Sequence, residues 1–222
     1  LKWLNVSSNQ LKEMPNIKLP KLEYLDISHN ITMEKVADGW TGHPTVRKIR
    51  SLETKFKTFA VFKNCPMLEE LYMAKNQLTT LGGWESLPKL KILHLRGNKI
   101  EKIQGGGEDE AEAPGLDALE YLNLRNNGIK DLELLVKCFQ FPALTDLNVI
   151  KNPVNDNYSS FNVLLAEVLM KNTKLKRFCK VDVEEKHKLE AVFFGQYKWE
   201  EAEKKRIEAE RLEAIKAEEE AA

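Results

Sequence analysis

Residues 90–100 read LKILHLRGNKI, with apolar residues at the first, fourth, sixth and eleventh positions and Asn98 at the ninth. The same spacing recurs through residues 1–154, in copies that begin 21 to 29 residues apart. The seven copies start at Leu1, Leu22, Val46, Leu68, Leu90, Leu119 and Leu144. A repeating unit of this length predicts a solenoid, because one unit cannot bury its own apolar side and must stack on its neighbours.

Two features of each copy indicate the geometry of a turn. Side chains such as Leu93 and Leu95 alternate with outward-facing residues, so each copy holds a short strand, and the stacked strands form a parallel sheet on the concave face. Proline precedes the first apolar position by two residues in five copies, where it ends the preceding segment. These prolines are Pro20, Pro44, Pro66, Pro88 and Pro142. The sequence therefore predicts an α/β solenoid of horseshoe shape.

An asparagine at the ninth position of the copies is expected to point inward and bond the backbone of adjacent turns. Buried peptide groups left unpaired would cost about 1–3 kcal/mol each. The structural ladder predicted in this way consists of Asn9, Asn30, Asn76, Asn98, Asn127 and Asn152. The degenerate third copy has Thr54 at this position, and we expect a looser or bulged ladder there.

The chain divides into three predicted segments. Residues 1–151 form the solenoid of about seven repeats, with a Gly-rich acidic surface loop at 105–115. Residues 152–183 form a C-terminal cap, since a solenoid end exposes apolar core unless an atypical unit covers it. Residues 184–222 form a projecting charged helix with favourable pairs such as Glu200–Lys204. Because the chain begins inside a repeat without Met, we expect it to be a piece of a longer protein.

Apolar residues in the tail are few and fall into two expected groups. Leu189, Val192 and Phe193 are expected to lie against the cap. The others are expected to reach a binding partner, a disordered tail being the alternative. This second group consists of Trp199, Ile207, Leu212 and Ile215.

Composition excludes several classes of function. The 34 basic and 34 acidic residues give a net charge of zero, which argues against nucleic-acid binding and against a polybasic membrane patch. No run of about 18 apolar residues is present, so we expect no membrane-spanning helix. Cys65, Cys138 and Cys179 lack disulfide or zinc spacing. They indicate small buried side chains in a protein of the reducing cytoplasm.

No motif for catalysis or for cofactor binding is visible. The four histidines are scattered and form no pair with metal-ligand spacing. Nucleophile-elbow, phosphate-loop and dinucleotide-binding fingerprints are absent. We therefore expect neither catalytic residues, nor a metal, nor a cofactor, nor a small-molecule substrate, and we interpret the chain as a non-enzymatic binding protein.

The third, fifth and seventh positions of each copy are expected to point outward from the concave sheet. Exposed aromatic residues and arginines there have the character of protein-binding hot spots. The residues predicted to bind a partner on this face are Trp3, Tyr24, Lys48, Arg50, Tyr72, His94, Arg96, Tyr121 and Arg125. The basic side chains among them favour a protein partner with an acidic helix or segment, whereas an ordinary exposed sheet is the alternative interpretation.

The repeat with its proline register resembles the intracellular leucine-rich-repeat class, which includes phosphatase regulators, a splicing factor subunit and an axonemal dynein light chain. The cap is similar to that of the class, although Phe178-Cys179 stands where the class usually has Leu-Asp. Within the class, residues 93–100, 119–126 and the charged C-terminal helix resemble an axonemal protein of the radial spokes. The resemblance implies a structural protein of the cytoskeleton in motile cilia and flagella. The alternatives are a phosphatase regulatory subunit and a ribonucleoprotein (splicing) component.

Overall fold

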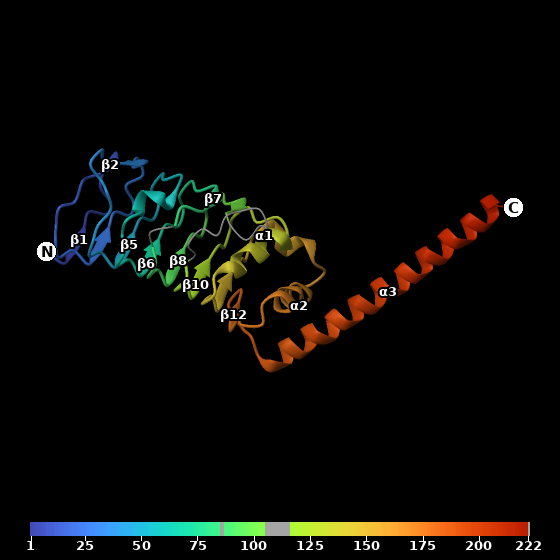
Figure 1. Cartoon of the computed structure of the whole chain (residues 1–222). Coiled ribbons are helices and arrows are strands. Elements are labelled where there is room, and N and C mark those ends of the chain that lie inside the picture. Colours follow the sequence, from blue (N-terminus) through green and yellow to red (C-terminus); the bar gives the residue numbers. More distant parts are fainter. Residues whose placement is uncertain (85–86, 105–115, 222) are drawn as a thin grey trace.

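The computed structural model describes residues 1–84, 87–104 and 116–221, with side chains except those of 59, 60 and 214–221. Within this part a nine-stranded sheet runs the length of the solenoid (Figure 1). Its strands, in spatial order, are β1 (Trp3–Asn5), β3 (Tyr24–Asp26), β5 (Lys48–Arg50), β6 (Glu70–Tyr72), β8 (Ile92–His94), β10 (Tyr121–Asn123), β11 (Asp146–Asn148), β12 (Arg177–Phe178) and β13 (Val181–Asp182). All neighbours are parallel except β12 and β13. The predicted α/β solenoid with a parallel sheet is confirmed.

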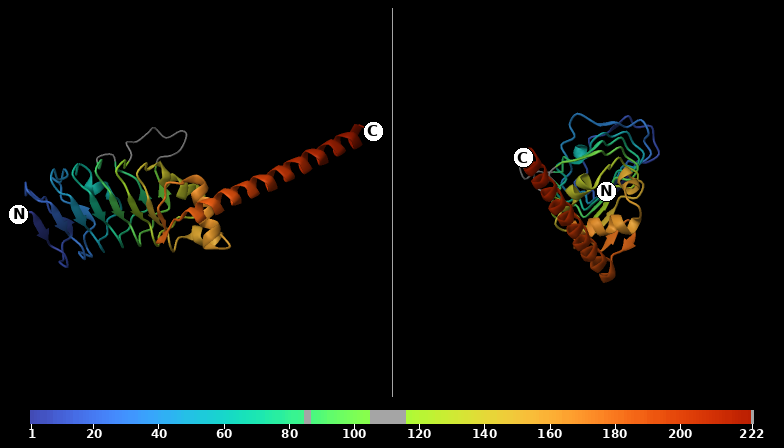
Figure 2. Two further views of the ribbon diagram at one scale, coloured as in Figure 1. Left: turned by 90° about the horizontal axis from the view of Figure 1, so that it is seen from below. Right: turned by 90° about the vertical axis from the view of Figure 1, so that its right-hand side faces the viewer.

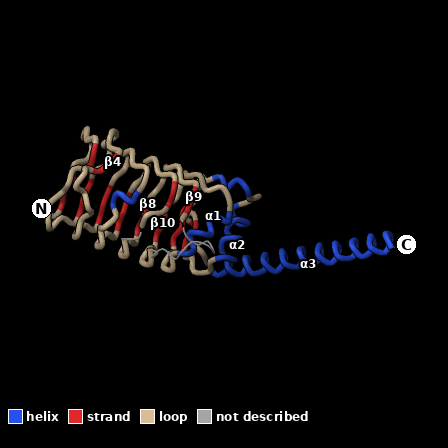
Figure 3. The backbone as a smooth tube through the Cα atoms, turned by 45° about the horizontal axis from the view of Figure 1, so that its top comes forward, coloured by secondary structure: helices blue, strands red, loops and turns tan. Residues whose placement is uncertain are grey.

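The central residue of each strand forms one inward column. From Leu25 on β3 to Leu147 on β11 these side chains are fully buried, and each contributes about 1.5–3 kcal/mol through burial. Leu4 on β1 is only partly buried, because no described turn stacks on its outer side. The opposite wall of the solenoid consists mainly of loops (Figure 3). Two short parallel pairs lie there: β2 (Glu13–Met14) with β4 (Lys35–Val36), and β7 (Thr80–Leu81) with β9 (Lys102–Ile103).

Each turn leaves the sheet through a residue in the left-handed conformation. Its N–H continues the inter-turn hydrogen bonds, as from Lys75 N to Arg96 O at 2.8 Å. Only one member of this column is glycine, and the others accept a conformation that costs roughly 1–2 kcal/mol. The column consists of Ser8, His29, Glu53, Lys75, Gly97, Asn126 and Lys151.

The ninth-position asparagines lie behind these turns. Asn98 Nδ2 donates to Met73 O and Leu95 O, both at 2.9 Å, while its Oδ1 accepts from Leu78 N at 3.1 Å. Asn30, Asn127 and Asn152 make the same three kinds of bond. In Asn76 the amide still donates across the turn, to Ser51 O. Asn9, at the free edge, bonds only within its own turn and is exposed.

The bulge expected at Thr54 is absent. Strand β5 pairs in register with both neighbours, as Tyr24, Lys48 and Glu70 align. The hydroxyl of Thr54 donates to Asn76 Oδ1 and lies 3.1 Å from Ser51 Oγ. Two small hydroxyl side chains thus occupy the space of one amide, and the prediction of a looser ladder was wrong.

The C-terminal end of the solenoid is covered by helices and a hairpin. Helix α1 (Leu132–Val136) and the 3-10 turns η2 (Lys137–Gln140) and η3 (Pro153–Asn157) lie in the last turns, whereas an earlier turn carries the 3-10 helix η1 (Phe59–Phe62). Helix α2 (Phe161–Lys171) is capped at its N-terminus by Ser160, whose hydroxyl accepts from Val163 N. Strands β12 and β13 form an antiparallel hairpin at the C-terminal edge of the sheet.

Helix α3 (Glu185–Ala221) runs away from the body as one continuous helix of 37 residues (Figure 2). Its first turns pack on α2 through the buried Ala191 and the partly buried Phe194, and Lys198 forms an ion pair with the buried Glu167. In the described residues, no helix has the length and apolar character that crossing a lipid bilayer requires.

One expectation about α3 was wrong. Leu189, Val192 and Phe193 do not lie against the cap, because each is more than half exposed. The cap-facing side is instead made by the small residues Ala191 and Gly195, which let the helix backbone approach α2 closely. An added Cβ at Gly195 would lie 2.7 Å from Met170 Sδ.

Candidate partner-binding face

The in-register pairing of the strands arranges the concave residues in straight rows. The first row runs through Trp3, Tyr24 and Lys48 and on to Tyr121. The second contains Arg50, Tyr72 and His94. Arg96 and Arg125 lie two residues beyond His94 and Asn123, at equivalent positions of neighbouring turns, since Gly97 N donates to Arg125 O at 2.9 Å. All nine residues predicted for this face therefore lie on one surface.

Aromatic side chains from three successive strands of this surface form a stack. The ring of His94 on β8 lies 4.7 Å from that of Tyr72 on β6, with 15° between the planes, and 4.8 Å from that of Tyr121 on β10. Burial raises the pKa of Tyr72 to about 12, and the hydrogen bond from its hydroxyl to Glu70 acts in the same direction. Burial lowers the pKa of His94. The stack is thus an uncharged, half-buried platform at neutral pH.

The positive charges of Lys48 and Arg50 are already compensated. Lys48 Nζ lies 2.6 Å from Glu70 Oε2, and Arg50 Nε lies 3.6 Å from Asp26 Oδ2. Both cations also sit over the Tyr72 ring, at 5.0 and 6.0 Å from its centroid. These two residues therefore brace the platform and offer little free charge to a partner.

Arg96 and Arg125 differ from them in having no acidic partner in the part of the chain that the structure describes. Neither guanidinium forms an ion pair with a carboxylate of the described residues, and the Nε of Arg125 is buried without a hydrogen-bond acceptor. The flanking residues of the same row, Ala74 and Ile150, cannot supply one. Two adjacent arginines of this kind beside an aromatic stack have the chemistry to hold an anionic group, because guanidinium can bind carboxylate in a bidentate manner.

A second aromatic pair lies at the N-terminal end of the same face. Trp3 and Tyr24 stack with their ring centroids 4.7 Å apart, and the Tyr24 hydroxyl donates to Asp26 Oδ2 at 3.1 Å. Trp3 is 68% exposed. The pair is separated from the Tyr72–His94–Tyr121 stack by β5, so the face offers two aromatic contacts with a charged strand between them.

The predicted tail residues are not part of this face. Trp199, Ile207 and Leu212 are exposed on α3, which leaves the solenoid at its C-terminal end. The side chain of Ile215 lies outside the described residues, as does the acidic loop 105–115. Sequence reasoning missed Tyr197 and the exposure of Leu189, Val192 and Phe193. The Ala191/Gly195 pair could have predicted which side of the helix is exposed, since small residues four apart mark the side of a helix that packs closely.

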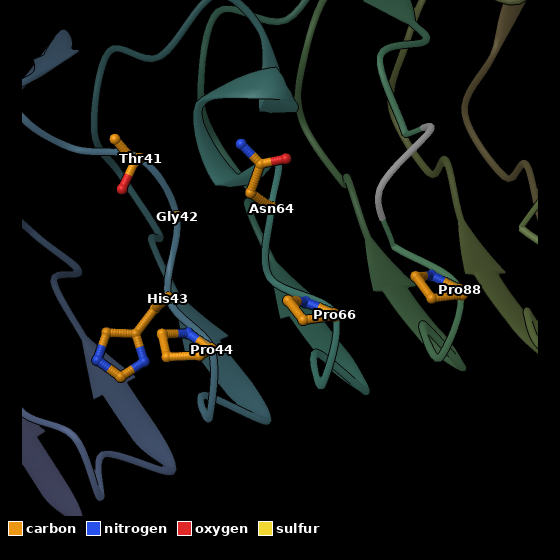
Figure 4. A pocket seen from close by; sticks show the side chains of 7 residues that line it. All are labelled: Thr41, Gly42, His43, Pro44, Asn64, Pro66 and Pro88. Carbon is orange, nitrogen blue, oxygen red and sulfur yellow. The ribbon is translucent and has the colours of Figure 1, made fainter.

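A further groove lies on the flank of the solenoid, with a volume of about 590 Å³ (Figure 4). It follows the proline register of three successive turns, and its lining consists of Pro44, Pro66, Pro88, Thr41, Gly42, His43 and Asn64. His43 Nδ1 accepts from Thr45 N at 3.4 Å, and burial lowers the pKa of its ring. The lining of the groove therefore combines three proline rings with the polar side chains of Thr41, His43 and Asn64. Within residues 1–84, 87–104 and 116–221, no cluster of three potential metal ligands occurs.

Comparison with known proteins agrees with this geometry. A family model described as leucine-rich repeats (2 copies) matches residues 66–105. The chain is 32% identical to leucine-rich repeat-containing protein 23 of Bos taurus over 200 residues. The aligned region covers 86% of this chain. The chain thus resembles leucine-rich repeat-containing protein 23 and matches leucine-rich repeats in residues 66–105. The human protein of that name is 31% identical, again over 86% of this chain.

The chain spans about half the length of these curated relatives, 54% of the bovine and 53% of the human protein. Among solved structures, a crystal structure of the Drosophila melanogaster SNF/U2A′ complex is similar with a TM-score of 0.50 and 25% identity. That likeness covers 58% of this chain and 69% of the other. The structural likeness supports the repeat architecture, and the sequence likeness supports the resemblance inferred from the repeats and the tail.

Proposed function

We propose that this chain is a non-enzymatic protein-binding scaffold of the axoneme, and a structural component of the radial spokes of motile cilia and flagella. The resemblance to leucine-rich repeat-containing protein 23 over most of the chain supports the cytoskeletal location. The single observation that carries the binding role is the concave face, where an aromatic stack lies beside two arginines that have no acidic partner among the described residues.

The arginine pair and the stack together favour an acidic protein segment as the partner. A carboxylate placed over Arg96 and Arg125 would accept from their guanidinium groups, neither of which forms an ion pair with a carboxylate of the described residues. The neighbouring Tyr72, His94 and Tyr121 would bury apolar surface without loss of side-chain freedom, because they are already held by stacking. Nucleic acid is a poorer fit, since the chain has no net positive charge.

The test is mass spectrometry of the proteins that co-purify with the tagged chain from ciliated cells after salt extraction. We expect radial spoke proteins in near-stoichiometric amounts with the wild type. We expect at least tenfold less of them with the double variant Arg96→Ala/Arg125→Ala, since hot-spot truncations cost about 2 kcal/mol or more. The matched control is Lys99→Ala/Lys102→Ala, which removes the same charge from exposed residues off the concave strands.

Two other functions would be recognised in the same experiment. Recovery of a phosphatase catalytic subunit without axonemal proteins would indicate a phosphatase regulator. Recovery of spliceosomal proteins would indicate a ribonucleoprotein component, and binding through phosphates would then weaken steeply with salt. Either result would overturn the axonemal assignment and leave the solenoid unchanged. Equal recovery with both double variants would instead refute the role of the arginine pair.

A further inference from the structure

Helix α3 carries an apolar stripe on the side that faces away from the cap. Leu189, Val192, Phe193 and Tyr197 are 58%, 65%, 69% and 61% exposed. Their spacing of three, four and eight residues from Leu189 places them on one face of the helix. The opposite face is the one that packs on α2, through Ala191, and no other described element covers the stripe. Contiguous exposed apolar surface of this kind marks an interaction site.

The charges at the two ends of the stripe are arranged symmetrically about Phe193. Lys186 lies seven residues before it and Glu200 seven residues after it, so both lie two turns away on nearly the same face. Both side chains are in an exposed position, and their only described partners are within α3 or just before it: Glu184 for Lys186 and Gln196 for Glu200. In line with the stripe, Lys186, which is paired with Glu184, therefore marks its N-terminal end, and Glu200 marks its C-terminal end.

A helix that covers this stripe must be amphipathic and must carry the reverse order of charges. A second copy of α3 laid antiparallel meets both conditions. With Phe193 opposite Phe193 of the second copy, Leu189 lies opposite Tyr197, and Lys186 lies opposite Glu200, on both sides of the two-fold axis. A parallel arrangement fails, because it would place Lys186 beside Lys186 and Glu200 beside Glu200.

We propose that the chain self-associates through an antiparallel pairing of two α3 helices, centred on Phe193. The contact is isologous, so each favourable pair occurs twice. The stripe is short, and the buried surface falls in the class below about 1,200 Å² that characterises transient complexes. The dimer is therefore weak and depends on protein concentration. The proposal is independent of the concave face, since α3 leaves the solenoid beyond its capped end.

The experiment is sedimentation velocity of the whole chain over a hundredfold range of concentration. We expect a concentration-dependent shift from monomer to dimer in the wild type and monomer throughout in Phe193→Asp. Lys186→Glu and Glu200→Lys should each raise the dissociation constant about three- to tenfold, and the double variant should restore it. Lys205→Glu, an exposed charge reversal on another side of α3, should leave the dimer unchanged.

The charge exchange is the decisive comparison. Recovery of the dimer in the double variant supports the antiparallel register, because only there does residue 186 meet residue 200. A wild type that stays monomeric at every concentration would overturn the proposal. So would a dimer that persists in Phe193→Asp, or single variants whose defects add rather than cancel. All substituted side chains are exposed, and circular dichroism checks that each variant remains folded.

Discussion

The imidazole of His94 lies flat against the phenol ring of Tyr72, with 4.7 Å between ring centroids and 15° between ring planes. Tyr121 closes the other side of the imidazole at 4.8 Å. Asn123 Nδ2 lies 3.4 Å from His94 Nδ1, so the ring also has a polar neighbour from β10. A histidine enclosed in this way is held in its neutral form, which makes the stability of the sheet sensitive to pH.

The first prediction concerns that sensitivity. Burial lowers the pKa of His94 below its unfolded value of about 6.5, although Glu70 opposes the shift. The stabilisation is thus complete above that pH and is lost as the pH falls towards the folded pKa. The free energy of unfolding, measured in urea at pH 7.5 and 5.5, should fall less in His94→Gln than in the wild type. Some pH dependence of the unfolding free energy should remain in His94→Gln, because burial also lowers the pKa of His43. Equal slopes in both proteins would contradict the prediction.

Asn98→Leu should destabilise the solenoid by about 3–5 kcal/mol. The substitution leaves Leu78 N and Met73 O without their partner, whereas Leu95 O keeps the bond from Asn127 Nδ2, and buried peptide groups cost about 1–3 kcal/mol each when unpaired. Asn9→Leu is the matched control, since Asn9 is exposed and bonds only within its own turn. It should cost less than about 1 kcal/mol. Chemical unfolding followed by circular dichroism gives both values, and similar losses would refute the ladder argument.

Gly42→Ala should be strongly destabilising, whereas Gly39→Ala should be mild. Gly42 has a φ of +99°, and a Cβ there would lie 2.3 Å from Asn64 O and 2.6 Å from Lys63 O. Backbone atoms cannot yield as a side chain can, so we expect a loss of at least about 2 kcal/mol. At Gly39 the nearest atom is the amide nitrogen of the Asn16 side chain, at 2.9 Å, which can move away. Thermal unfolding of the two variants checks the difference.

Ala191→Glu should release the start of α3 from the cap. Ala191 is buried against α2, and a carboxylate has no described partner there. Backbone amide exchange in residues 187–198 should accelerate in this variant and remain slow in Ala202→Glu, where the same substitution is made on an exposed part of the same helix. If exchange is unchanged in Ala191→Glu, the docking contact described for α3 is wrong.

The regular part of the structure was predictable because identical residues recur at identical depths. Once Leu93 and Leu95 point inward, every equivalent residue does, and the strand register follows. The prediction at Thr54 was wrong because it considered only that a hydroxyl makes fewer hydrogen bonds than the amide of asparagine. The contact between the Thr54 and Ser51 hydroxyls fills this space, and the repeat pattern does not reveal it. Pairing of Lys48 with Glu70 could have been predicted, since both occupy the third position of adjacent copies.

The tail was harder for a physical reason. Apolar residues occur on two sides of the first turns of α3, at Phe193 and at Phe194, and helical spacing alone does not say which side meets the cap. The choice depends on how closely α2 can approach, and small residues at 191 and 195 decide it. The uncompensated state of Arg96 and Arg125 likewise depends on their neighbours in space across the sheet.

Helix α3 also has a mechanical consequence. At a rise of 1.5 Å per residue, its 37 residues form a rod about 55 Å long. Within the described residues, the rod is held to the body near its base, where Ala191 and Lys198 meet α2. For such a rod, a tilt of about 5° at the base displaces the far end by about 5 Å. The protein thus contains a lever: a small rearrangement where Lys198 meets Glu167 becomes a large movement far from the sheet, and a load on the tip acts on the cap with the same leverage.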